Sequence, residues 1–153
     1  MPAIAPDPAE RVRAFEERCR EAGVPVTVQR RLILETMLRR TDHPTAEQVH
    51  EALPADAGIS RATVYRTLEF LVQLGVIGRA MHTGAATRFD ANAGHHHHLV
   101  CVSCGRVTDY TDTRLDRLPL PDRSGGGFRT LDYSIHFTGL CPACQPPDAA
   151  DIH

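Results

Sequence analysis

The stretch GHHHHLVCVSCGRVTDY, residues 94–110, decides how the second half of this chain folds. Its four consecutive histidines lie in the interior of the chain, directly upstream of the pair Cys101-x-x-Cys104, so they are not a terminal purification tag. A second pair, Cys141-x-x-Cys144, follows after 36 intervening residues. Two such pairs on tight turns can direct four thiolates at one tetrahedral Zn²⁺. We therefore expect a closed structural zinc site rather than two redox pairs, because redox chemistry needs only one pair.

The histidine run predicts two further ligand pairs. Side chains alternate between the faces of a strand, so His96 and His98 point one way while His95 and His97 point the other. The residues whose chemistry could complete the first pair are Asp90, Asp109 and His43. Nitrogen and oxygen ligands suit Fe²⁺ or Mn²⁺, while Zn²⁺ and Ni²⁺ remain open. If His43 belongs to the set, the site bridges two domains and can act as a switch.

Upstream of this stretch, helical spacing and capping signals predict four helices. Their predicted ranges are 8–22, 28–40, 46–53 and 61–74. The predicted N-caps are Asp7, Thr27, Thr45 and Ser60, and Thr45 forms a capping box with Gln48. The last helix has one apolar face, which leaves Arg61, Tyr65 and Arg66 outside it. Cys19, spaced with apolar residues of the first helix, is expected to fill the core.

Two short strands, 76–82 and 87–90, flank a turn at 83–86 and predict a β-hairpin after the helices. Helices followed by a hairpin predict a winged helix-turn-helix. Residues 95–100 and 106–110 predict strands, a short helix near 112–118 should end at Pro119, and 128–137 alternates as a last strand. The expected fold class is α+β: an N-terminal winged helix-turn-helix domain followed by a small α/β dimerisation domain with a four-cysteine zinc site.

These patterns divide the 153 residues into domains. The expected boundaries are 1–90 for a winged-helix DNA-binding domain, 91–94 for a hinge, 95–145 for a metal-binding dimerisation domain and 146–153 for a flexible tail. A membrane span needs about 18 consecutive apolar residues and none is present, so we expect a cytoplasmic protein without a membrane partner. The net charge of −2 excludes a global basic field, and nucleic-acid binding must rest on a local patch.

Five motifs together resemble the ferric uptake regulator family. They are G-V-x-V-T-x-Q-R (23–30), H-P-T-A-E-x-V (43–49), S-R-A-T-V-Y-R-T-L (60–68), R-F-D (88–90) and H-H-H-H-x-x-C-x-x-C-G (95–105). The resemblance implies a homodimeric, metal-dependent transcriptional regulator, usually a repressor, that binds a palindromic double-stranded DNA operator. It does not imply an enzyme.

Residue by residue, the resemblance implies a regulatory metal site and a DNA-binding helix. The regulatory ligands would be His43, Asp90, His96, His98 and Asp109, and the structural zinc ligands Cys101, Cys104, Cys141 and Cys144. The helix at 61–74 matches the recognition helix, with Arg61, Thr63, Tyr65 and Arg66 as DNA contacts. In many relatives the opposite face carries another metal site. Here its members would be His95, His97 and Asp116, but Tyr133 stands where relatives have a histidine, so we expect that site to be incomplete.

Aspartate at both 90 and 109 makes the chain most like the peroxide-responsive branch of the family. In that branch, bound Fe²⁺ reacts with peroxide, a ligating histidine such as His43 or His96 is oxidised, and DNA is released. The alternatives are an iron-, zinc- or nickel-uptake regulator without peroxide sensing. Less favoured alternatives are a metal buffer without DNA recognition and a metalloenzyme with an open His/Asp site. His82 on the hairpin is expected to be an exposed residue rather than a further ligand.

Overall fold

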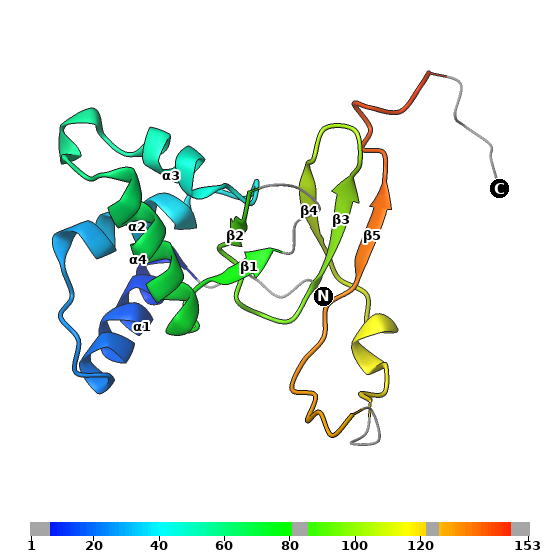
Figure 1. Ribbon diagram of the computed structural model, residues 1–153, viewed down its shortest axis with the longest axis horizontal. Helices are drawn as coiled ribbons and strands as arrows, with labels where there is room; N and C mark the ends of the chain where they lie inside the picture. Colours follow the sequence, from blue (N-terminus) through cyan, green and yellow to red (C-terminus); the bar gives the residue numbers. More distant parts are fainter. Residues whose placement is uncertain (1–6, 81–85, 122–125, 148–153) are drawn as a thin grey trace. The chain divides into compact units, whose positions relative to one another are not determined.

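The computed structural model describes residues 7–80, 86–121 and 126–147, and the chain divides between Ala93 and Gly94 into two compact units. Within these described ranges, the first unit holds four α-helices and a two-stranded sheet, and the second holds a three-stranded sheet and four cysteines (Figure 1). None of the helices in the same ranges is long and apolar enough to cross a membrane. The predicted α+β class is confirmed.

The helices begin at the capping residues that the sequence indicates. α1 spans Pro8–Glu21, α2 Val28–Leu38, α3 Ala46–Ala52 and α4 Arg61–Gln73, and one 3₁₀ turn, η1, spans Ala55–Ala57. Thr45 and Gln48 form both hydrogen bonds of the predicted capping box, at 3.0 and 3.2 Å. The Ser60 hydroxyl accepts the backbone N–H of Thr63 at 3.1 Å, which fixes the start of α4. α2 ends at Leu38, two residues before the predicted end at 40.

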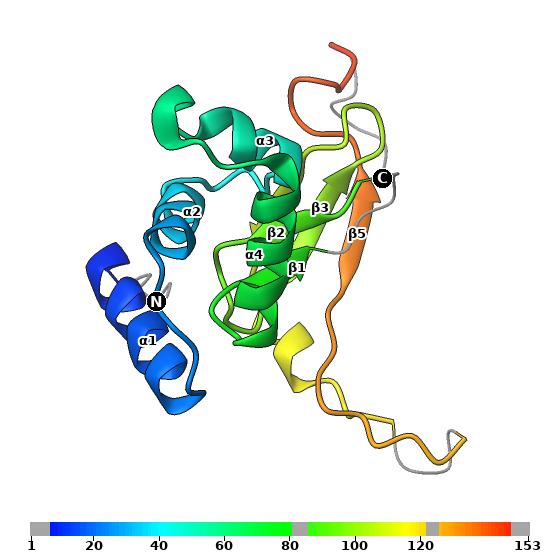
Figure 2. The same ribbon diagram turned by 60° about the vertical axis from the view of Figure 1, so that its left-hand side comes forward.

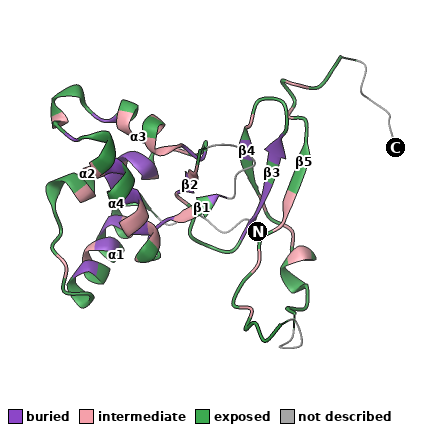
Figure 3. Ribbon diagram, viewed as in Figure 1, coloured by how far each residue is buried: buried purple, intermediate pink, exposed green. Residues whose placement is uncertain are grey.

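The core of the first unit lies between these helices. α4 packs along α2 and α3, and α1 packs against α2 (Figures 1 and 2). In Figure 3 the ribbon is coloured by burial, and the buried residues of the first unit lie along the helices and the short hairpin. The largest of them are Phe15, Phe89, Ile33, Leu34, Met37, Leu68 and Leu71, and Cys19 is buried among them as predicted. Each such apolar side chain stabilises the unit by roughly 1.5–3 kcal/mol, so the helical unit has a core of its own.

A short hairpin follows α4. β1, Gly78–Ala80, pairs antiparallel with β2, Arg88–Asp90. His82, at the end of the predicted strand 76–82, and residues 83–85 of the predicted turn lie outside the described residues. β2 also contacts the loop before α3, since Thr45 and Arg88 form an isolated bridge and the Phe89 N–H donates to the Pro44 carbonyl at 2.9 Å. Asp90 therefore ends a strand that is attached to the 43–45 loop.

The second unit is a small sheet in the order β4-β3-β5. β3, His97–Cys101, lies in the middle; β4, Val107–Tyr110, pairs with it antiparallel and β5, His136–Gly139, pairs with it parallel (Figure 1). Leu115–Arg117 forms one 3₁₀ turn, η2, in place of the predicted short helix, and Pro119 follows. β3 is mostly buried and β5 mostly exposed (Figure 3). This unit has a thin apolar core.

The predicted strand at 128–137 is wrong in extent. Pairing begins only at His136 and runs to Gly139, and Leu131 is 79% exposed. The physical reason is that β3 itself begins at His97, so earlier residues of the last segment have no paired strand beside them in the described part of the chain. Most of the predicted tail, namely 148–153, lies outside the described residues.

Candidate functional site

The four cysteines of the two C-x-x-C pairs meet at one end of the second unit. Cys101 ends β3 and Cys141 follows β5, and the four Sγ atoms lie within 4.8 Å of one another. The Sγ atoms of Cys104 and Cys141 are 3.7 Å apart. Four sulfurs bound tetrahedrally to Zn²⁺ at 2.3 Å would be about 3.8 Å apart, so the spacing is consistent with structural zinc.

Backbone turns build this cluster and favour the thiolate form of Cys101. The N–H of Gly105 donates to the Cys101 carbonyl and the N–H of Cys144 donates to the Cys141 carbonyl, both at 2.9 Å. Gly105 has φ of 76°, a conformation that suits glycine. The backbone N–H of Cys141 donates to Cys101 Sγ at 3.3 Å, and this contact is the main reason that the pKa of Cys101 is lowered to about 6. At Cys101, the thiolate form that binds a metal is therefore favoured at neutral pH.

Two candidate ligands meet in the first unit. His43 lies in the loop between α2 and α3, Asp90 ends β2, and His43 Nε2 is 3.3 Å from Asp90 Oδ2. The Arg88 guanidinium donates to the His43 carbonyl at 3.0 Å. The unit thus presents one imidazole and one carboxylate side by side.

Three more candidate ligands share one face of the sheet in the second unit. Asp109 on β4 lies opposite His98 on β3, and its Oδ1 is 3.3 Å from His96 Nε2 and 3.7 Å from His98 Nε2. His96 Nδ1 donates to the Gly94 carbonyl at 2.6 Å. This bond keeps the proton of the neutral ring on Nδ1 and leaves Nε2, which faces Asp109, as the nitrogen that can bind a metal.

His136 lies beside these residues on the same face. It pairs with His98 across the parallel strands, and their rings stack with centroids 5.1 Å apart and an angle of 22°. Burial lowers the pKa of His136, which favours its neutral form. Sequence alternation alone does not indicate the contact of His136 with His98, because that contact depends on the parallel register of β3 and β5.

The other face of β3 holds a second polar cluster. One ligand atom each of His95, His97 and Asp116 lies within 4.8 Å of the others. Asp116 Oδ1 is 2.9 Å from His97 Nε2 and 3.5 Å from His95 Nε2, while Asp132 contacts His95 Nδ1 at 3.0 Å. No sequence pattern indicates this contact of Asp132, because the residue lies within the predicted strand 128–137, where only alternation is visible.

Two further hydrogen bonds in this cluster involve the segment before β5. The backbone N–H of Ile135 donates to His97 Nδ1 at 3.2 Å. The Tyr133 hydroxyl donates to the Leu115 carbonyl and accepts the Leu118 N–H, the latter at 3.2 Å. Tyr133 therefore joins η2 to the sheet.

The exposed face of α4 carries the predicted nucleic-acid contacts. Tyr65 is 49% exposed, and Arg61 and Arg66 are also exposed, whereas the opposite face of the helix is buried. Arg61 forms an ion pair with Glu47 of α3 at 2.9 Å. Thr63 lies in the first turn, where its hydroxyl accepts from Ser60 at 3.0 Å. Basic, aromatic and hydroxyl groups thus stand together on one exposed surface, as DNA contacts require.

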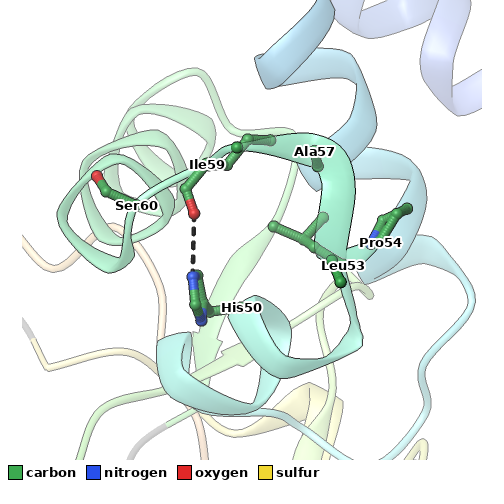
Figure 4. Close-up of a pocket in the computed structure, with 8 residues that line it drawn as sticks. His50, Leu53, Pro54, Ala57, Ile59 and Ser60 are labelled. Atoms are coloured by element: carbon green, nitrogen blue, oxygen red, sulfur yellow. Dashed lines mark hydrogen bonds between the residues drawn. The ribbon is translucent and has the colours of Figure 1, made fainter.

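A shallow pocket beside this helix has a structural explanation. It is lined by His50 and Leu53 of α3 and by residues 54–60 of the following loop (Figure 4). The His50 ring donates to the Ile59 carbonyl at 3.0 Å, so the pocket wall is the contact that holds the loop before α4. The pocket brings no cluster of ionisable side chains together, and we assign it no site.

Comparison with known proteins identifies the family. The sequence matches the ferric uptake regulator family over residues 21–138. The chain belongs to this family. Ferric uptake regulators are metal-dependent transcriptional regulators that bind operator DNA as dimers, and this homologue is a regulator rather than an enzyme.

Three relatives illustrate the similarity. The chain is 31% identical over 127 residues to the peroxide-responsive repressor PerR of Staphylococcus aureus, covering 82% of this chain and 86% of that protein. The ferric uptake regulator Fur of Helicobacter pylori superimposes with a TM-score of 0.73 at 19% identity, covering 94% and 97% of the two chains, and shows the shared fold. The ferric uptake regulator of Pseudomonas aeruginosa with manganese superimposes with a TM-score of 0.64 at 29% identity, covering 83% and 97%.

In this ferric uptake regulator homologue, the predicted ligands form four local groups. They are the four cysteines; His43 with Asp90; His96 and His98 with Asp109; and His95 and His97 with Asp116. Sequence reasoning missed the polar neighbours of these groups, which are Arg88, Asp132 and His136. The R-F-D motif could have pointed to Arg88, but no local pattern indicates the contacts of Asp132.

Proposed function

We propose that this homologue is a cytoplasmic repressor whose binding to a palindromic operator depends on a divalent metal held by His43, Asp90, His96, His98 and Asp109. The observation that carries the proposal is the division of ligand-type residues between the two units. One unit offers one imidazole and one carboxylate at 3.3 Å, and the other offers two imidazoles and one carboxylate. Each set alone has too few ligands for a tight site. A metal that binds both sets would link the two units.

The donor set favours Fe²⁺ or Mn²⁺ as the regulatory metal. All five residues offer nitrogen or oxygen, whereas the sulfur ligands are gathered in the separate four-cysteine site. The homologue from Pseudomonas aeruginosa is described with manganese, which supports the same choice. Zn²⁺ and Ni²⁺ are the alternatives, because imidazole binds both.

The arrangement of these side chains explains why operator binding would depend on a metal. The Gly94 carbonyl holds the His96 ring with Nε2 deprotonated toward Asp109, and Asp90 meets His43 Nε2. Only an orientation of the two units that brings both sets to one ion satisfies all five ligands. The metal therefore favours that orientation by its differential affinity, and the dimer then presents two α4 helices at the spacing of a palindrome.

Peroxide sensing is the finer form of this proposal. It is supported by the 31% identity to a peroxide-responsive repressor and by aspartate at both 90 and 109. Bound Fe²⁺ would supply the electron transfer that activates peroxide beside its ligands. With that iron bound, the ring carbon between the two nitrogens of His43 or His96 would take one OH group from H₂O₂, and its hydrogen would leave with the other OH group as water. The oxidised ring would then be a poor metal ligand. The metal would then be released, and the two sets of ligands would no longer be held together by one ion.

The third polar group, His95, His97 and Asp116, is proposed not to bind a metal. The related protein from Helicobacter pylori has three functional metal-binding sites, so this chain's own residues must decide the matter. His97 Nδ1 accepts the Ile135 N–H, so the neutral ring carries its proton on Nε2, where it donates to Asp116 at 2.9 Å. A ligating histidine has the opposite arrangement: it donates from the second nitrogen and keeps the metal-facing one deprotonated. Tyr133 offers no imidazole in compensation.

The test of the proposed function is fluorescence anisotropy of a labelled operator from the gene's own promoter region with zinc-loaded protein. Mn²⁺, anaerobic Fe²⁺, Zn²⁺ and Ni²⁺ are added separately, followed by a small dose of peroxide. We expect Mn²⁺ and Fe²⁺ to promote binding, and peroxide to abolish it only in the iron form, with a mass gain of one oxygen on His43 or His96. Binding that survives peroxide would identify a plain metal regulator.

Substitutions on α4 separate a repressor from a metal buffer. Arg61→Ala and Tyr65→Ala should weaken operator binding by about 1–3 kcal/mol each where a base contact is lost, while metal affinity is unchanged. Arg13→Ala, on α1, is a control for the loss of a surface arginine elsewhere in the same unit. If wild-type protein binds metal but no variant of α4 alters DNA binding, the chain does not use this helix for DNA recognition.

A further inference from the structure

His43 has an unusual backbone conformation. Its φ is 52°, and among the described residues it is the one non-glycine residue with positive φ. Left-handed conformations are disfavoured for residues with a Cβ atom. A following proline, here Pro44, also pushes the preceding residue toward extended conformations. Two local preferences therefore oppose the conformation of this residue, and it persists only because its surroundings hold it.

β2 supplies the contacts that hold it. The Arg88 guanidinium donates to the His43 carbonyl at 3.0 Å across 45 positions of sequence. The Phe89 N–H donates to the Pro44 carbonyl at 2.9 Å, and Arg88 forms a backbone bridge with Thr45. Of these contacts, the Arg88 side chain is the one that acts directly on the carbonyl of His43.

The same strand ends at the residue that meets the His43 ring. Asp90 Oδ2 lies 3.3 Å from His43 Nε2, two positions after Arg88. A change of the His43 backbone would move its imidazole away from Asp90, since the φ torsion sets the direction of the side chain. Arg88 thus holds the backbone carbonyl of His43, and Asp90 contacts its imidazole.

We propose that Arg88 is a positioning residue for the regulatory metal site: it holds His43 in its left-handed conformation and so brings Nε2 beside Asp90. This inference rests on the proposed function, because it takes His43 and Asp90 as metal ligands. Arg88 itself touches no metal in this proposal.

Charge and positioning predict opposite effects of removing Arg88. A guanidinium near a divalent cation repels it, so by charge alone the substitution would tighten metal binding. Positioning predicts weaker binding, because His43 would relax toward the extended conformation. Residues that orient metal ligands typically change affinity by about 10–100-fold when they are substituted.

The test is Mn²⁺ binding to zinc-loaded, full-length protein, followed by electron paramagnetic resonance of free Mn²⁺. Arg88→Met and Arg88→Ala both remove the donor, and Met keeps an apolar stem. We expect the Mn²⁺ dissociation constant of either variant to rise about 10-fold or more. Arg88→Lys keeps the charge and a donor without the guanidinium geometry, so its Mn²⁺ affinity should lie between that of the wild type and that of the other two variants. If Arg88→Met and Arg88→Ala unfold, Arg88→Lys provides the test.

Matched variants separate the two proposals. Arg18→Ala removes another arginine that donates to a backbone carbonyl in the same unit, that of Leu74 at 2.7 Å, and should leave Mn²⁺ affinity unchanged. If the wild type binds no Mn²⁺, or His43→Ala binds it as well as the wild type, the proposed function fails. If His43→Ala loses Mn²⁺ but every Arg88 variant binds as tightly as the wild type, only the positioning role of Arg88 is overturned.

Discussion

At the scale of single residues, the left-handed conformation of His43 gives a stability prediction whose sign is opposite to the usual one. Replacing glycine by alanine normally stabilises a protein by about 0.4–1 kcal/mol through the unfolded state. At φ 52° the native conformation favours glycine instead. We expect His43→Gly to be more stable than His43→Ala by about 1 kcal/mol in urea unfolding followed by helical circular dichroism.

Both variants lose the imidazole and its contact with Asp90, so the comparison isolates the backbone. His43→Asn is a second check, because asparagine tolerates the left-handed region better than alanine. An alanine variant as stable as the glycine variant, or more stable, would show that residue 43 is not strained.

Tyr133 gives a second prediction at this scale, on metal stoichiometry. The wild type should bind two metals per protomer in native mass spectrometry, one at the cysteines and one at the regulatory site. Tyr133→His should bind three, because the new imidazole would take the ligand role that His97 cannot fill, beside the His95 ring, whose centroid is 5.1 Å from that of Tyr133.

Tyr133→Phe is the matched control. It removes the hydroxyl that bonds the Leu115 carbonyl, which should cost about 1 kcal/mol, and adds no ligand. A third metal in the wild type would contradict the metal-free assignment of the His95, His97 and Asp116 group.

Residue-scale prediction from sequence succeeded where a simple periodicity applies. Alternation along β3 correctly separated His96 and His98 from His95 and His97, because the two faces of a strand are fixed by its geometry. It could not show which ring nitrogen carries a proton, because that depends on distant partners such as Ile135. The positive φ of His43 could not be predicted from the sequence either, because the contacts that hold it come from a strand 45 positions away.

At the scale of elements, the four-cysteine site ties β3 to the end of β5 in a unit with few buried apolar residues. We expect Cys141→Ser to release zinc and unfold this unit, because zinc binding supplies folding free energy where the core is thin. Cys19→Ala, in the helical core of the first unit, should keep full zinc content. The measurement is zinc released to a chromogenic chelator, together with NMR of both units.

The helical resonances of the first unit should persist in Cys141→Ser, because that unit has its own core. Loss of the helical unit as well would mean that the two units fold as one. Retention of zinc in Cys141→Ser would contradict the four-sulfur assignment.

Element boundaries were predictable where side chains cap them. Thr45, Gln48 and Ser60 form the expected bonds, because a cap acts within three residues of itself. The last strand was overestimated, because the alternation of Leu131 and Ile135 records side-chain spacing and not the presence of a partner strand. The extent of the last strand depends on where its partner β3 begins, and β3 lies far from β5 in the sequence. A local pattern of the kind that identifies a cap cannot show this.

At the scale of the whole molecule, exposed apolar side chains on the second unit are consistent with the proposed homodimer. Leu99 of β3 and Phe137 of β5 are paired in register, so their side chains share one face, and they are 41% and 43% exposed. Leu140 directly after β5 is 44% exposed. Burial of such side chains in a dimer would contribute roughly 1.5–3 kcal/mol for each one fully covered.

We therefore expect Phe137→Glu to raise the dimer dissociation constant by on the order of 100-fold, because it removes apolar contact and would bury a charge. Analytical ultracentrifugation over a range of concentrations measures this, with zinc content as the check that the unit is folded. Val28→Glu changes an 84% exposed residue at the start of α2 and should leave the dimer intact. Operator affinity should also fall in Phe137→Glu, because a protomer that cannot dimerise presents only one α4 to the palindrome. If the dimer persists in Phe137→Glu with unchanged affinity, the protomers associate through another surface, and the exposed face of β3 and β5 has no part in dimerisation.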